Sequence, residues 1–176
     1  MKKTLIAALA AGLLIVLPAT AQNPRIDIKH LDKPNNKATR HVEISLSGSD
    51  LKMAIEKKDS KLREALKDVN GIFVRVLSLG EKDSISNEDI EAIKRQIKPP
   101  WKPLLLLKGN NNQNANIHVL VDSKTETLRG LVVLFADAHE FTFVNIVGNI
   151  EPNKLYLLGG NFGVPKMSFN EKNKDE

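Results

Sequence analysis

The chain contains no cysteine in 176 residues. It therefore has no disulfide framework, no thiolate metal site and no cysteine nucleophile. Since no cysteine follows the apolar run near the N-terminus, a lipoprotein anchor on a modified cysteine is also excluded. We expect stability to come from packing alone.

Catalytic motifs are missing as well. The sequence has no nucleotide-binding glycine fingerprint, no phosphate-binding loop, no zinc-protease helix motif and no serine nucleophile elbow. No pair among the four histidines has the close helical spacing of a metal site. We therefore expect no catalytic residue, no cofactor-binding residue, no metal ligand and no enzyme activity. The histidines are His30, His41, His118 and His139.

Charge gives little support for nucleic-acid binding. The formal net charge is +5, and removal of residues 1–21, which hold two lysines and no acid, lowers it to +3 (5 minus 2). The remaining basic residues alternate with acids along the helical segments, which is typical of a solvated surface and not of a clustered basic footprint. We expect no nucleic-acid partner.

The N-terminus has the pattern of an export signal. Two lysines, an apolar run over residues 5–17 and the small residues Ala19 and Ala21 predict a secretory signal peptide cleaved after Ala21. An uncleaved membrane anchor is the alternative, although the run is short for a bilayer span. We predict a periplasmic or secreted protein that does not span the membrane after cleavage.

The remaining chain has room for one domain and one core. We expect a signal peptide over 1–21, a poorly ordered leader over 22–40, a single α+β domain over 41–169 and a disordered tail over 170–176. The leader lacks a sustained period and contains two prolines and several asparagines, which is why it is separated from the domain.

Periodicity predicts the elements of that domain. Period-two alternation over 41–47 favours a strand, and apolar spacings of three and four over 51–69 and 90–97 favour two amphipathic helices. Residues 128–150 form the most apolar stretch and predict a central hairpin. The expected fold is α+β, with a mixed or largely antiparallel sheet of about six strands, a C-terminal meander, two amphipathic helices on one face and a short C-terminal helix.

Two polar residues stand inside predicted core strands. Asn145 is the one amide in the second arm of the hairpin, and a satisfied structural hydrogen bond is favoured over ligand contact. Arg75 is the one charge in the strand over 72–79, so it must reach an edge or pair with an acid.

The joint of the hairpin holds the nearest approach to a reactive constellation. Asp137, His139 and Glu140 follow one another closely and could bind a cation or share a proton. An ordinary solvated turn contains the same residue types. No further ligand from elsewhere in the chain can be named, so the turn interpretation is favoured.

Several segments together carry a family resemblance. The stretch GLVVLFADAHEFTFVNIVGNIEPNKL, with the signal peptide, the amphipathic helix, WKPLL and GGNFGVP, resembles the exported bacterial family called domain of unknown function 4252. The resemblance covers about residues 42–164. It implies an exported α+β protein, without catalytic residues to carry over, and a gene neighbourhood with extracytoplasmic-function sigma regulators that would hint at an envelope-response accessory.

Three hypotheses for function follow from the sequence. The favoured one is a non-catalytic periplasmic binding or regulatory accessory module with an envelope protein as possible partner. The alternatives are a small hydrolase or metal-dependent enzyme that uses Asp137, His139 and Glu140, and a self-associating structural envelope protein. The sequence leaves the oligomeric state open.

Overall fold

A computed structural model describes residues 23–32, 38–83, 86–108, 114–122 and 124–161. The predicted signal peptide and the predicted C-terminal tail lie outside these residues. Within the described ranges, every helix is too short or too polar to cross a membrane.

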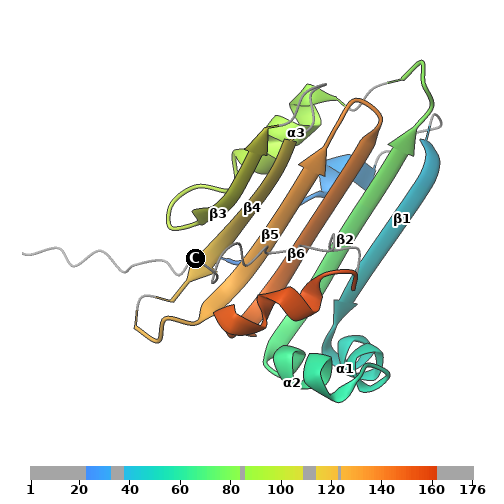
Figure 1. The fold of residues 1–176 in the computed structure, drawn as a ribbon. Coiled ribbons are helices and arrows are strands. Elements are labelled where there is room, and N and C mark those ends of the chain that lie inside the picture. Colours follow the sequence, from blue (N-terminus) through green and yellow to red (C-terminus); the bar gives the residue numbers. More distant parts are fainter. Residues whose placement is uncertain (1–22, 33–37, 84–85, 109–113, 123, 162–176) are drawn as a thin grey trace, which may run out of the picture.

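Six antiparallel strands form one open sheet in the order β1-β2-β6-β5-β4-β3 (Figure 1). The last four strands follow the chain as a meander, and β6 and β5 occupy the centre. The predicted α+β fold, its six strands and its C-terminal meander are confirmed. The strands are β1 (Ala38–Ser47), β2 (Val69–Leu79), β3 (Lys102–Lys108), β4 (Asn114–Val121), β5 (Leu128–Ala136) and β6 (Glu140–Ile150).

The sheet has a core on each face. One face, here called the first face, is covered by α1 (Gly48–Glu56), α2 (Ser60–Leu66) and the 3-10 helix η2 (Pro152–Leu158). The opposite or second face is covered by α3 (Asn87–Lys94) and by residues 23–32, which end in the 3-10 helix η1 (Lys29–Asp32). Figure 1 shows the first set in front of the sheet and the second set behind it.

Alternation along the central strands explains the two cores. On β6, Val144 and Ile146 point into the first core, whereas Phe141 and Phe143 point into the second, and all four are buried. A strand that is apolar on both sides must be covered on both sides. The long apolar run over residues 128–150 therefore predicted a central position correctly.

The placement of the second predicted helix is a correction. Both amphipathic helices were expected on one face, but Ile93 of α3 packs in the second core and Leu62 and Leu66 of α2 pack in the first. An apolar stripe on a helix requires an apolar partner surface, and this sheet offers one on either side. The stripe alone does not decide between them.

The N-terminal part of the predicted leader also differs from expectation. Residues 23–32, here called the strap, lie across the second face and bury Ile26 and Leu31, which are 4% and 8% exposed. Residues 38–40 already belong to β1. Tertiary contacts therefore hold a segment that has no periodic pattern of its own.

Candidate functional site

The hairpin joint is built as a turn. Oδ1 of Asp137 accepts hydrogen bonds from the backbone N–H groups of His139 (2.8 Å) and Glu140 (2.6 Å). Nδ1 of His139 donates to the backbone oxygen of Asp83 at 2.9 Å. The described ranges contain no group of three histidine, aspartate or glutamate residues that could hold a metal ion. The carboxylate of Asp137 is therefore engaged in an Asx turn that closes the hairpin.

The other histidines lie apart from this joint. Nε2 of His30 is 3.2 Å from the backbone oxygen of Asp89, and Nε2 of His41 is 2.7 Å from a guanidinium nitrogen of Arg75. His118 lies half-buried on β4, where burial lowers the pKa of its imidazole. Its Nδ1 atom has no hydrogen-bond partner among the described residues.

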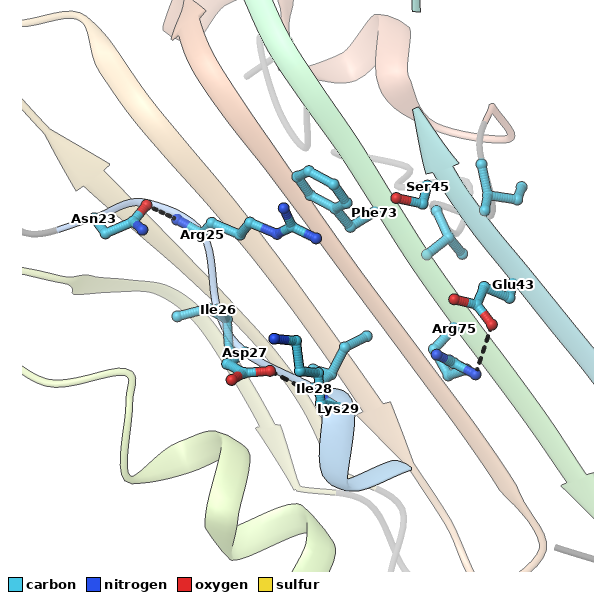
Figure 2. Close-up of a pocket in the computed structure, with 12 residues that line it drawn as sticks. Asn23, Arg25, Ile26, Asp27, Ile28, Lys29, Glu43, Ser45, Phe73 and Arg75 are labelled. Atoms are coloured by element: carbon cyan, nitrogen blue, oxygen red, sulfur yellow. Dashed lines mark hydrogen bonds and ion pairs between the residues drawn. The ribbon is translucent and has the colours of Figure 1, made fainter. Parts of the chain in front are cut away.

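A pocket of about 380 Å³ lies between the strap and the β1–β2 side of the second face (Figure 2). We call it the strap pocket. Strap residues line one side and residues of β1 and β2 line the other, so it exists only because the strap crosses the sheet. The pocket combines cationic, acidic, amide and aromatic side chains in one concave surface, so several polar groups converge on it.

Asn145 holds the strap on the sheet. Its Oδ1 accepts from the backbone N–H of Ile26 at 2.9 Å, and its Nδ2 donates to the backbone oxygens of Pro24 (3.0 Å) and Leu131 (3.2 Å). The side chain is 0% exposed. The predicted structural hydrogen bond of Asn145 is confirmed, and it joins segments 119 residues apart in sequence.

Two further contacts fix the strap. The side chain of Gln96 accepts from the N–H of Asp27 at 2.8 Å and donates to its carbonyl oxygen at 2.7 Å, so it pairs with the backbone as a neighbouring strand would. At Gly130, an added Cβ would lie 2.7 Å from the Trp101 ring and 3.1 Å from Cβ of Pro24. The absence of a side chain at Gly130 therefore lets Trp101 and the strap approach β5 closely.

The floor of the pocket contains a buried cation. Arg75 is 2% exposed, and its guanidinium lies 3.0 Å from Oε2 of Glu43 across the β1–β2 ladder, where the two residues are directly paired. His41, on the same face of β1, accepts a further hydrogen bond from Arg75 because a guanidinium can only donate. The predicted acid partner of Arg75 is therefore Glu43.

The mouth of the pocket carries a second arginine. The guanidinium of Arg25, on the strap, lies over the ring of Phe73 at 4.1 Å from its centroid. Figure 2 shows this side chain extending from the strap toward β2. A guanidinium stacked in this way is attracted by the ring face and keeps its N–H groups in the plane, where an anionic group can accept them.

Sequence reasoning missed this site because it excluded the strap from the domain. A signal was nevertheless present: Ile26, Ile28 and Leu31 are apolar residues in a polar segment, and all three pack against the second core. Asn145 gave a second signal, since a buried amide inside a strand needs hydrogen-bond partners from outside that strand.

Fold and site define an α+β protein with an open antiparallel sheet, covered on both faces and crossed by an N-terminal strap. The family described as domain of unknown function DUF4252 matches residues 34–158, which is most of the chain. The chain belongs to this family. The strap lies just before the matched span, while Asn145, Arg75 and Glu43 lie inside it.

Comparisons with curated proteins and with solved structures returned no significant match.

Proposed function

We propose that this chain is an exported, non-catalytic binding module of the cell envelope, periplasmic or secreted, with the strap pocket as its ligand site. The lysines and apolar run at the N-terminus, with small residues up to Ala21, support export. The observation that carries the binding proposal is the strap pocket, which is lined by the stacked Arg25 and by the ion pair between buried Arg75 and exposed Glu43.

Charge at the pocket supports an acidic ligand. Three basic residues line it, Arg25, Lys29 and Arg75, against the two acids Asp27 and Glu43. Arg75 is already compensated by Glu43, and Oδ1 of Asp27 accepts from the backbone N–H of Lys29 at 3.0 Å. Arg25 is therefore the group that we assign to ligand recognition.

Size and shape support a short peptide segment. A volume of about 380 Å³ accommodates one or two side chains, and strap residues form one side of the pocket. We assign the ligand as an acidic segment of an envelope protein, in which a carboxylate meets Arg25. The engagement of Asp137 and His139 in their own turn supports a structural role for the hairpin joint instead.

Site-specific photocrosslinking in cells tests the proposal. A benzophenone amino acid replaces Ser45, which lines the pocket. The same amino acid at Ser47 is the matched control, because both serines are exposed and lie on the same face of β1. We expect a heterologous adduct from Ser45, identified by mass spectrometry, a much weaker one from Ser47, and loss of the Ser45 adduct in Arg25→Ala.

Two results would count against the proposal. Equal adducts from both serines would mean that the crosslinking is not specific to the pocket. A Ser45 adduct of unchanged yield in Arg25→Ala would mean that the arginine does not recognise the ligand. Folding of each variant is checked by circular dichroism.

A further inference from the structure

β1 is an edge strand of the sheet. One side of β1 pairs with β2, and no other described strand pairs with its outer side. Val42, Ile44 and Leu46 pack against the first core but are only partly buried, in contrast to their buried partners on β2. An edge strand with unpaired backbone groups and a partly exposed apolar row is a template for another strand.

The opposite edge, at β3, differs. It begins with Lys102 and Pro103, both exposed. Proline lacks the N–H donor that strand pairing uses, and an exposed lysine discourages edge association. β1 contains no proline, whereas Lys102 and Pro103 discourage strand addition at the beginning of β3; farther along β3, Leu104 and Leu106 are exposed.

We propose that the β1 edge pairs with β1 of a second copy of this chain, antiparallel, around a two-fold axis through Val42. A symmetric pair of this kind is self-complementary and closes as a dimer, in which the two sheets become one. Opposed residues must share a face of the sheet. With the axis at Val42, the opposed pairs in the regular part of β1 are Val42 with Val42, His41 with Glu43 and Arg40 with Ile44, since the β1–β2 register is irregular between Ala38 and Arg40.

Charge selects this register from its neighbours. An axis at Glu43 would place two glutamates directly opposite each other, and an axis at His41 would oppose His41 with itself and not with Glu43. Like charges directly opposite destabilise a strand pair, whereas opposite or hydrogen-bonding pairs stabilise it. Only the axis at Val42 opposes His41 with Glu43, and it does so twice by symmetry.

The local hydrogen bonding of His41 fits this pairing. Because Nε2 of His41 accepts from Arg75, the neutral ring carries its hydrogen on Nδ1. In the dimer that N–H is the donor available to Glu43 of the second copy. The cluster of Arg75, Glu43 and His41 would then continue across the interface.

A single cysteine tests the register because the chain has none of its own. Residues opposed on a two-fold axis have Cα atoms about 4.5 to 5.5 Å apart, within the range that a disulfide spans. We expect the purified exported chain to elute as a dimer in size exclusion with light scattering. Val42→Cys should form a disulfide-linked dimer in high yield under mild oxidation, and Leu105→Cys, half-buried on the other edge strand, should not.

A second variant removes the association without a crosslink. Val42→Lys places two lysines opposite each other on the axis, so we expect the molar mass to halve while the circular dichroism spectrum is retained. The proposal is overturned if the wild-type chain is monomeric up to about 200 µM, or if Leu105→Cys crosslinks as well as Val42→Cys. Crosslinking of Val42→Cys in cells only to a different protein would assign the edge to that protein and would also overturn it.

Discussion

The side-chain oxygen of Asn145 accepts a hydrogen bond from the backbone N–H of Ile26 at 2.9 Å, at a point where both residues are buried. This contact ties the strap to the central strand of the sheet. Because the strap forms one wall of the pocket, Asn145 determines whether the candidate site exists, although it does not line the site.

Replacing Asn145 by alanine should release the strap. The change removes the acceptor for the N–H of Ile26 and the side-chain donor to the backbone oxygens of Pro24 and Leu131, and we expect a loss of about 2 to 3 kcal/mol in the free energy of unfolding. Urea unfolding measures the loss. The fluorescence of Trp101, the only tryptophan, reports on the strap because Pro24 packs beside it over Gly130. Asn149→Ala, an exposed asparagine on the same strand, is the control and should change neither quantity.

Gly148 should tolerate no side chain. Its φ is +130°, and an added Cβ would lie 2.6 Å from backbone atoms of Asp68, Val69 and Asn70, which cannot move independently of β2. We expect Gly148→Ala to cost about 3 kcal/mol or more in the free energy of unfolding. Gly80→Ala should be close to neutral, since Gly80 has open space around it. Equal melting temperatures for the two variants would contradict this assignment.

His118 should make stability depend on pH. Burial lowers its pKa below the ordinary value of 6.5, so the unfolded chain binds a proton at a higher pH than the folded chain does. Stability from this group is complete above about pH 6.5 and falls as the pH drops toward the folded-state pKa. We expect unfolding curves of the wild type and of His118→Leu to diverge over that window. A pH dependence identical in both would show that His118 contributes nothing.

Asp137 should stabilise the hairpin turn and take no part in catalysis or binding. Asp137→Ala removes the acceptor for two backbone N–H groups, and we expect a loss of about 1 kcal/mol in the free energy of unfolding. Asp137→Asn keeps the oxygen and should recover most of it. Glu140→Ala, at the same joint, should have little effect. A Ser45 photo-adduct that is lost in folded Asp137→Ala would instead link this joint to binding.

Most of the fold could be predicted from the sequence. Alternation at Val42, Ile44 and Leu46 and the apolar run ending at Ile150 identified strands, and the meander followed from their order. The prediction that α3 lies on the same face as the first amphipathic helix was wrong. Ile93 needs an apolar surface, and the sheet presents one on each face.

The site could not be predicted in the same way. Ile26 is buried in the second core and its backbone N–H donates to the side chain of Asn145, 119 positions away, and no local pattern encodes such a contact. Arg75 was expected to have an acidic partner, but its identity as Glu43 depends on the register between β1 and β2. A pocket between a non-periodic strap and the face of β1 and β2 can be recognised only when the positions of both are known.

The most direct test asks whether ligand binding depends on the attachment of the strap to the sheet. The yield of the Ser45 photo-adduct is measured in Asn145→Ala, with Asn149→Ala as control, under conditions where both variants are folded. The account predicts that release of the strap removes Arg25 from the pocket and abolishes the adduct, while the control retains it. An adduct of undiminished yield in Asn145→Ala, with the strap shown by Trp101 fluorescence to be released, would contradict the claim that the strap pocket is the binding site.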